Sequence, residues 1–528
     1  MLKSALLDPL ISVLFLLWLA LASMVGPIPE YHALMVIVAF FSVLVFLHPM
    51  NGVYFLLIMV PFFLGDSKRP YFSAIEVFVY LTLLSGLIHY LRGEKKPVLI
   101  PFRWAILLFV LSGLMSMPLN LKELYYEVKG RPWIEVWKIL KISHEGFNLY
   151  YVRSLLNNLS AVGLYLVCVY FIRDADELIS LFKPLCIIFT LVVFFAYVLR
   201  LELIPHPDSY LGMSLVGRYP FGPGQIGISG FAYNTGYLGQ YLVMTFPFLF
   251  FYVFSWKDHR WMALLCLVFF IIGLMTIPFT YQRGPVIAFV FEALILVSFL
   301  ARGVLSSGSK NRLSFSIKVI STVGGMFAGL FCADYFLFHG IGMKRLAAMT
   351  QGLGPRGQIW KVAWEMFKSH PVLGIGVGKF HLAFPQYCEP AGIVWAGYIR
   401  YIRTTAHNVY LHLLAEQGLL GLLSFMTLIF LFFRAGWDHY ISFTRERRLI
   451  VLTVLLALSG WLAYGLTQTL FYLRVMQIFF WLMLGFLAVL LKPHLQERPL
   501  NRKWIFSGGV LFVFLFLYRF FMILKWKG

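Results

Sequence analysis

The stretch MALLCLVFFIIGLMTIPFT at residues 262–280 contains no charged residue. It is followed by YQRGP at residues 281–285 and then by a second apolar stretch that continues to residue 301. A helix needs about 20 apolar residues to cross the roughly 30 Å core of a bilayer. Both stretches are therefore predicted to be membrane-spanning helices, and one arginine, Arg283, lies at their junction.

Stretches of this kind recur along almost the whole chain. Of its 528 residues, 60% are hydrophobic and only 13% are charged, whereas a soluble domain carries about 25% charged residues. The sequence therefore predicts an all-α, polytopic membrane protein with about 12–15 transmembrane helices. The expected spans are residues 9–25, 31–48, 52–65, 71–91, 101–118, 153–172, 180–200, 234–256, 260–280, 284–301, 314–336, 406–434, 449–470 and 475–491, with a further apolar segment at 504–524.

Basic residues outnumber acidic residues, with 44 Lys and Arg against 23 Asp and Glu and a net charge of +21. If the N-terminus lies in the cytoplasm, five short connections on the inner side are basic, as the positive-inside rule predicts. These connections are residues 92–96, 257–260, 302–312, 445–448 and 492–503. The same orientation in the membrane places three longer connections on the outer face, at residues 119–152, 201–233 and 337–405.

The outer loop at residues 337–405 is itself basic, with eight Lys and Arg but only two Glu. Orientation in the membrane does not require this excess, because long loops cross regardless of their charge. An anionic partner on the outer side is the simplest explanation. The alternative is a solvated surface beside anionic lipid headgroups.

The same loop contains an expected amphipathic helix at residues 355–368. Three of its aromatic residues recur at the spacing of one helix face, namely Trp360, Trp364 and Phe367. Such a helix is predicted to lie along the outer surface of the membrane. Alternating glycines follow it, and they predict a loop with a close backbone approach: Gly374, Gly376 and Gly378.

Ionisable residues lie in three short stretches at the predicted outer boundary of the spans. The first two stretches contain Arg218 and Arg283. Arginine suits phosphate oxygens, because its planar guanidinium stays charged and donates paired hydrogen bonds. Gly222 and Gly284 would let a ligand approach the backbone closely, and Pro285 favours a helix N-terminus, where phosphate binds well. Each arginine alone could instead be a snorkelling residue at the membrane interface.

The third stretch contains His407, the candidate general base. A neutral imidazole can take a proton from an attacking hydroxyl, and nearby arginines favour the neutral form. The alternative is an interfacial histidine at the start of a helix. Glu416 follows nine residues later, about 13 Å along a regular helix, so direct contact with His407 is not expected.

Several catalytic motifs are absent from the sequence. It has no G-x-x-x-x-G-K-[ST] phosphate loop, no H-E-x-x-H and no paired C-x-x-C, so ATP hydrolysis and a zinc site are not expected. The outer loops lack a D-x-D cluster, which disfavours metal-dependent transfer from a nucleotide sugar. A reaction at the outer face on an already activated, lipid-borne phosphate would need neither ATP nor metal, and no cofactor is expected.

These residues resemble the motifs of the O-antigen ligase family of bacterial inner-membrane glycosyltransferases. Arg218 to Gly222 matches an arginine that is followed, after three residues, by glycine. His407 to Gly418 matches a histidine that is followed, after ten residues, by glycine. The two patterns resemble those of the family in their order and spacing. The resemblance covers about residues 210–435.

The resemblance implies an all-α, GT-C-like membrane glycosyltransferase that acts at the periplasmic face on a glycan linked to undecaprenyl diphosphate. Ligases of the family transfer the glycan to the lipid A core in lipopolysaccharide biosynthesis. Polymerases of O-antigen or exopolysaccharide transfer it to another repeat unit, and related enzymes transfer it to protein serine or threonine. By this resemblance Arg218 and Arg283 would hold the diphosphate, and His407 would assist the acceptor hydroxyl or bind the diphosphate.

Further substrate contacts are expected from Arg356, Gly222, Gly284, Gly376 and Asn408. The expected partners are the lipid-linked glycan, its acceptor and membrane lipid, and not nucleic acid. A function of another class stays open, a flippase or exporter of lipid-linked glycan with the basic outer loops as its vestibule. Three regions are predicted: an N-terminal bundle at residues 1–200, a ligase-like core at 201–435 and C-terminal helices at 436–528.

Overall fold

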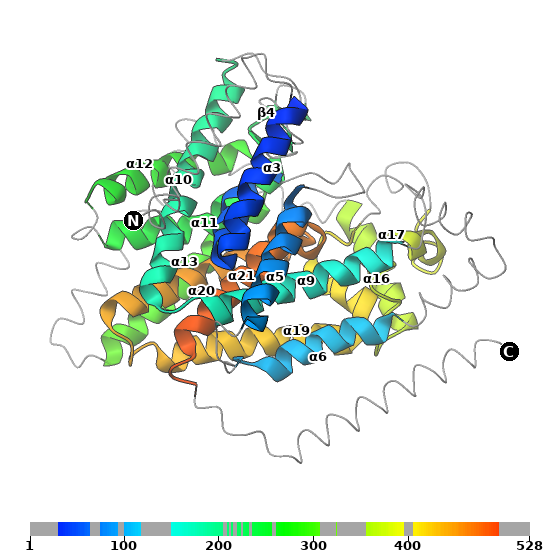
Figure 1. Cartoon of the computed structure of the whole chain (residues 1–528). Helices are drawn as coiled ribbons and strands as arrows, with labels where there is room; N and C mark the ends of the chain where they lie inside the picture. The colour runs from blue at the N-terminus through cyan, green and yellow to red at the C-terminus, as the bar shows by residue number, and fades with distance from the viewer. Residues whose placement is uncertain are drawn as a thin grey trace. The chain divides into compact units, whose positions relative to one another are not determined.

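A computed structural model describes residues 30–63, 74–92, 100–117, 149–203, 209–210, 213–214, 219–222, 225–231, 235–255, 260–306, 324, 355–394 and 405–495. These residues are mostly helical, which confirms the predicted all-α, polytopic fold (Figure 1). Several predictions concern residues outside this set: the expected spans at 9–25 and 504–524, nearly all of the span at 314–336, most of the loop at 119–152, and Arg218.

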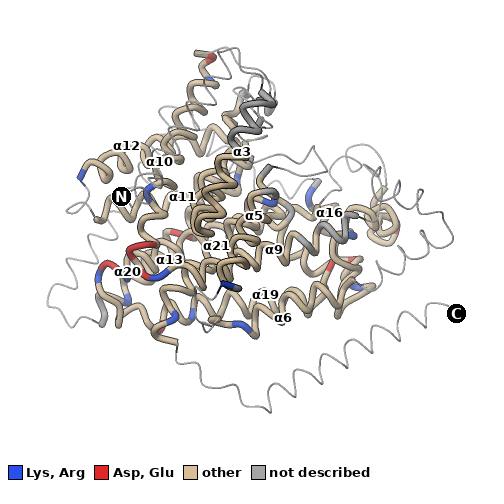
Figure 2. The backbone as a smooth tube through the Cα atoms, viewed as in Figure 1, with Lys and Arg blue, Asp and Glu red and all other residues tan. Residues whose placement is uncertain are grey.

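Seven of the described helices are long and apolar enough to cross a membrane. They are α10 (Ala175–Arg200), α11 (Thr235–Phe254), α12 (Arg260–Phe279), α13 (Gly284–Ser306), α19 (Val409–His439), α20 (Arg445–Tyr464) and α21 (Arg474–Leu491). Further apolar helices are α3 (Glu30–Leu47), α4 (Pro49–Met59), α5 (Ala74–Leu91), α6 (Arg103–Ser116) and α9 (Leu149–Phe171). Figure 2 shows that these helices are largely free of charged residues along their lengths. Such helices satisfy their own backbone hydrogen bonds, which a bilayer requires.

The first of two compact units contains α3 to α5, α10 to α13, α20 and α21. Within it α11, α13 and α20 pack through small residues. A β-carbon on Gly239 of α11 would lie 2.5 Å from the ring of Pro285 in α13. Tyr464 of α20 donates its hydroxyl hydrogen to the carbonyl oxygen of Gly236 at 2.7 Å. These contacts fix the start of α13 against the start of α11 and the end of α20.

Two short β-hairpins precede α11, and the sequence did not predict them. They pair β1 (Ser209–Tyr210) with β2 (Met213–Ser214), and β3 (Tyr219–Gly222) with β4 (Gln225–Gly227). In the second hairpin Tyr219 lies opposite Gly227. Ile228, the next residue, donates its N–H to the carbonyl oxygen of Phe279 at 3.0 Å. The hairpin that begins at Tyr219 is thus attached to the end of α12, four residues before Arg283.

The second unit contains α6, α16 (Pro355–Ser369), α17 (Phe380–Ala383), η4 (Phe384–Tyr387) and most of α19. Both α9 and α19 contribute residues to the two units, and the predicted division into three regions stays a prediction. The core of the second unit is formed by aliphatic and aromatic residues: Ile359, Val362, Ala363, Met366, Ile375, Phe380, Ala383, Phe384, Cys388, Ala406 and Ala415.

Helix α16 occupies the position that the sequence predicted for an amphipathic helix, but it has two apolar faces. The face buried in the unit is the aliphatic one that starts at Ile359. The aromatic face is more open, since Trp364 is 47% exposed and its ring lies 5.0 Å from that of Phe367. The predicted contact of this aromatic face with the membrane surface stays a prediction.

Candidate active site

His407 lies directly before α19 in a strained backbone conformation. Its φ is +48°, in the left-handed region, which costs a residue with a β-carbon about 1 kcal/mol or more. The next residue, Asn408, caps the helix: its Oδ1 accepts the N–H groups of Tyr410 at 2.9 Å and Leu411 at 3.0 Å. The N–H of His407 donates to Thr405 Oγ1 at 3.4 Å. The backbone on each side of this partly buried histidine is therefore held by hydrogen bonds.

Ala406, immediately before His407, is fully buried and is bonded through both of its backbone polar groups. Its N–H donates to Nδ1 of His412, one turn into α19, at 3.3 Å. Its carbonyl oxygen accepts the indole N–H of Trp360 in α16 at 3.0 Å. The peptide that leads into His407 is thus connected to two different helices.

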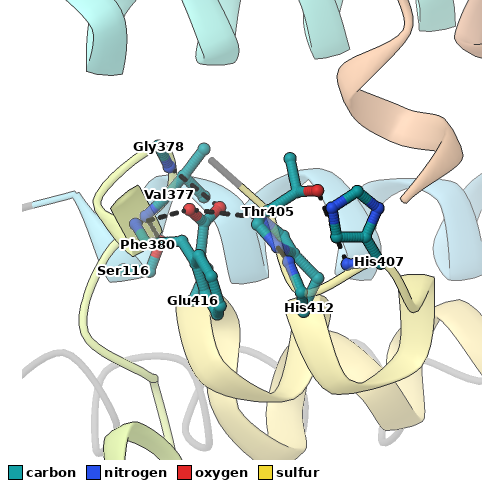
Figure 3. Close-up of polar contacts among 9 residues, drawn as sticks. Ser116, Val377, Gly378, Phe380, Thr405, His407, His412 and Glu416 are labelled. Atoms are coloured by element: carbon teal, nitrogen blue, oxygen red, sulfur yellow. Dashed lines mark hydrogen bonds and ion pairs between the residues drawn. The ribbon is translucent and has the colours of Figure 1, made fainter. Parts of the chain in front are cut away.

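Glu416 connects α19 to the start of α17 and the segment just before it (Figure 3). Its Oε2 accepts the N–H of Gly378 and its Oε1 accepts the N–H of Phe380, both at 2.9 Å. Oε1 also lies 3.3 Å from Nε2 of His412, and both side chains are only 4% exposed. Glu416 is therefore linked to the His407 segment through His412.

The expected span at residues 406–434 corresponds to α19, a candidate membrane span, but the helix breaks inside it. Helix α19 begins at Val409 and breaks at Gly418, whose φ is +64° and ψ is −162°. The break exposes backbone groups on each side of Gly418 to a second segment. Four bonds of 2.8–3.1 Å join them: Ile375 N–H to Ala415 O, Gly376 N–H to Glu416 O, Leu419 N–H to Pro371 O and Leu420 N–H to Val372 O. Gly418, the glycine of the histidine-x₁₀-glycine pattern, is therefore needed because the backbone has a positive φ at this position.

The loop of alternating glycines makes the close backbone approach that the sequence predicts, and it makes it to α19. A β-carbon on Gly374 would lie 2.2 Å from the carbonyl carbon of Glu416. Gly376 has a φ of +117°, and its carbonyl oxygen accepts the N–H of Lys379 at 3.2 Å. Since its N–H is also bonded, both backbone groups of Gly376 are used within the fold. Its expected contact with substrate stays a prediction.

Arg283 lies at the junction of α12 and α13, as predicted. Its carbonyl oxygen accepts the N–H of Ile287 at 3.2 Å, so Arg283 occupies the N-terminal boundary of α13. The N–H groups at a helix N-terminus carry partial positive charge. A guanidinium and the positive end of a helix therefore occur at one place in the first unit.

Two of the glycines expected near substrate have structural roles in the described residues, one in packing and one in strand pairing. A β-carbon on Gly284 would lie 2.6 Å from Thr467 Oγ1 and 2.9 Å from Cε2 of Tyr464. Gly222 ends β3 and lies opposite Gln225. Arg356 lies in the first turn of α16 and is partly buried. Substrate contacts for all three residues stay predictions.

Three residues of the site carry roles that the sequence analysis missed. His412 and Glu416 are four residues apart, a spacing that places both on one face of a helix, and this polar pair in an apolar span was a usable signal. Trp360 was assigned to an interfacial face, and nothing in its spacing indicates a bond to Ala406. Among the described residues, no group of three or more His, Cys, Asp or Glu could hold a metal ion.

Most of these polar residues fall in one contiguous region of the chain. Residues 267–426 match the O-antigen ligase family model. This match supports the resemblance to that family which the sequence motifs indicated. The matched region contains Arg283, Arg356 and His407, whereas Arg218 precedes it. No curated protein matches the chain.

The family match also identifies the general class of activity. The O-antigen ligase region supports a membrane glycosyltransferase of the O-antigen ligase or polymerase kind, which acts on glycans in the membrane. Among the described residues, the seven helices that are long and apolar enough to cross a membrane agree with a multi-pass membrane protein. The chain is therefore not expected to act as a soluble enzyme.

Proposed function

We propose that this protein transfers a glycan from undecaprenyl diphosphate to an acceptor hydroxyl at the periplasmic face of the bacterial inner membrane. The favoured acceptor is a sugar hydroxyl of the lipid A core, as in an O-antigen ligase. The observation that carries this proposal is Arg283 at the N-terminal boundary of α13, inside the region that matches the family.

In the proposed reaction the acceptor oxygen attacks the anomeric carbon of the donor sugar. The bond from that carbon to the diphosphate oxygen breaks, and negative charge grows on the departing undecaprenyl diphosphate. Arg283 and the start of α13 would stabilise this charge more in the transition state than in the ground state. Arg218 is proposed to bind the same diphosphate, because the next residue, Tyr219, begins the hairpin that is attached to the end of α12.

His407 is proposed to accept the proton of the attacking hydroxyl, or to bind the diphosphate. Its position at the start of α19 is consistent with either role. The orientation predicted from basic short loops places both the α12–α13 junction and the start of α19 on the outer side. In this proposal the arginines and the start of α13 supply charge stabilisation and His407 supplies proton transfer, so the proposed reaction uses no metal and no cofactor.

The test is product analysis with purified protein in detergent, a labelled lipid-linked glycan donor and competing acceptors. The wild-type protein should form a new glycosidic bond. Arg283→Ala should lower the rate about 10²- to 10³-fold, as loss of one transition-state donor typically does, and Arg218→Ala and His407→Ala should also be severe. Arg260→Ala is the control, because Arg260 is exposed at the opposite end of α12 and should leave transfer unchanged.

The product distinguishes the alternatives. Glycan on lipid A core supports ligation, whereas a longer glycan that is still linked to lipid supports polymerisation. A protein that moves the donor across a vesicle membrane without forming any glycosidic bond is a flippase or exporter, and the proposal is then wrong. Near-normal transfer by both arginine variants would contradict the mechanism.

A further inference from the structure

We infer that Trp360, His412 and Glu416 are positioning residues that fix the direction of the Cα–Cβ bond of His407, from which its imidazole projects. The inference rests on the proposed function, in which His407 acts on the substrate. It concerns how the protein holds that histidine, and it involves residues that make no proposed contact with donor or acceptor.

Both backbone polar groups of Ala406 are bonded, and the residue is 0% exposed. Trp360 bonds the carbonyl oxygen at 3.0 Å, and this carbonyl belongs to the peptide that joins Ala406 to His407. His412 accepts the N–H at 3.3 Å. Because water does not reach Ala406, loss of either partner would leave a buried backbone group unpaired. The orientation of this peptide is therefore closely restricted.

The other side of His407 is fixed as well. Asn408 caps α19, so the residue after His407 is tied to the first turn of the helix. His407 itself has a φ of +48°, which an L-residue adopts only where its surroundings impose it. With the backbone fixed on both sides, the Cα–Cβ bond of His407 has one direction. Figure 3 shows the Glu416, His412 and His407 side chains in sequence along the start of α19.

Glu416 influences which ring nitrogen of His412 carries the proton. Nδ1 of His412 accepts the N–H of Ala406, so in this arrangement its proton is on Nε2. Nε2 lies 3.3 Å from Glu416 Oε1, an ion-pair contact rather than an aligned hydrogen bond, and the negative charge of the carboxylate favours a proton on this nitrogen. The carboxylate is in turn fixed by the N–H groups of Gly378 and Phe380. A continuous set of contacts thus runs from the glycine loop to the peptide before His407.

The first test uses Trp360→Phe, which removes the indole N–H and keeps an aromatic ring, with the more exposed Trp364→Phe on the same helix as its control. Misplacement of a catalytic group by about 1 Å can cost 10²-fold in rate. We expect Trp360→Phe to lower kcat about 10- to 100-fold with the KM for donor little changed, and to speed hydrogen exchange at the amides of Ala406 and His407. Trp364→Phe should change none of these quantities.

His412 is tested by two variants. His412→Phe removes both ring nitrogens and should lower kcat to the same degree as Trp360→Phe. His412→Asn keeps an acceptor near the Nδ1 position for the N–H of Ala406, so it should recover part of the lost kcat. Recovery by asparagine separates positioning from general packing, because phenylalanine matches the ring shape better. Equal kcat values for the two variants would contradict the inference.

A double variant separates this inference from the proposed function. If Trp360 acts only through His407, then Trp360→Phe should cause no further loss of rate in the His407→Ala background. Full transfer by His407→Ala alone would overturn the proposed role of His407. A severe loss in His407→Ala together with wild-type kcat and wild-type amide exchange in Trp360→Phe would overturn the positioning inference alone.

Discussion

Gly374 packs against the backbone of Glu416 so closely that a β-carbon on Gly374 would lie 2.2 Å from the carbonyl carbon of Glu416. A matching contact occurs at Gly418, where a β-carbon would lie 2.4 Å from the carbonyl carbon of Val372. Backbone atoms cannot move aside as the end of a flexible side chain can. The glycine loop and the break in α19 are therefore mutually dependent, and both lie beside the residues that hold His407.

Gly374→Ala should destabilise the protein severely, since it combines this clash with a φ of +64°. Gly392→Ala is the matched control: Gly392 has a φ of +67° but no atom within 4 Å of its added β-carbon. Conformational strain alone should cost the control about 1–2 kcal/mol. The measurement is the unfolding temperature in detergent. Equal losses for the two variants would show that the close approach contributes nothing.

Glu416→Gln should destabilise the second unit although it preserves the shape of the side chain. The glutamine oxygen can accept one of the two N–H groups of Gly378 and Phe380, and its amide nitrogen cannot accept the other. An unsatisfied buried N–H costs about 1–3 kcal/mol. Glu365→Gln is the control, because Glu365 pairs at 2.7 Å with Lys368, which is 53% exposed, and such surface pairs contribute at most about 1 kcal/mol. A larger loss of unfolding temperature in the control would contradict this account.

The sequence predicted the spans well because their cause is local. A run of about 20 apolar residues has few alternatives to a membrane helix, and the expected spans at 260–280 and 475–491 correspond closely to α12 (Arg260–Phe279) and α21 (Arg474–Leu491). The break at Gly418 was not predicted. It depends on backbone groups of residues 371–376 that replace the lost helical bonds, and such pairing between distant segments leaves no periodic signal.

Prediction of the candidate site from sequence has the same limit, because contacts between distant segments leave no local signal. The positions of Arg283 and His407 at the ends of apolar runs were visible in the sequence, and the structure places both at helix N-termini. The roles of the glycines were ambiguous, because a close backbone approach has the same sequence pattern whether a ligand or another segment approaches. Trp360 was also ambiguous, since α16 has two apolar faces and only tertiary packing decides which is buried.

Cys388 should be a slowly reacting thiol in the folded protein. It is 1% exposed, its Sγ donates to the carbonyl oxygen of Phe384 at 3.4 Å, and burial raises its pKa. The thiolate is the reactive form, so alkylation of Cys388 by iodoacetamide at pH 8 should be much slower than alkylation of a thiol introduced by Lys361→Cys on the exposed face of α16. Peptide-resolved mass spectrometry gives both rates.

The same raised pKa gives a pH dependence with a definite sign. The folded state favours the neutral thiol of Cys388. The stability that the folded protein gains from keeping this thiol neutral is fully present at pH values below the ordinary thiol pKa. As the pH rises through that value, the unfolded state ionises first, and this contribution decreases. Cys388→Ala should therefore lose less stability than the wild-type protein as the pH rises above the ordinary thiol range. Identical pH profiles for the two proteins would contradict the assignment.

Gly284→Ala tests whether this glycine serves packing or ligand approach. The added β-carbon would lie 2.6 Å from Thr467 Oγ1 and 2.9 Å from the ring of Tyr464, which is buried and bonded to Gly236. Overpacking of this kind costs about 1–3 kcal/mol, so a lower unfolding temperature is expected. Gly303→Ala on the same helix is the control, because its β-carbon would lie at an ordinary 3.6 Å from Tyr440. If Gly284→Ala instead abolishes transfer at an unchanged unfolding temperature, the glycine serves the approach of a ligand to Arg283, as the sequence first suggested, and the packing explanation is wrong.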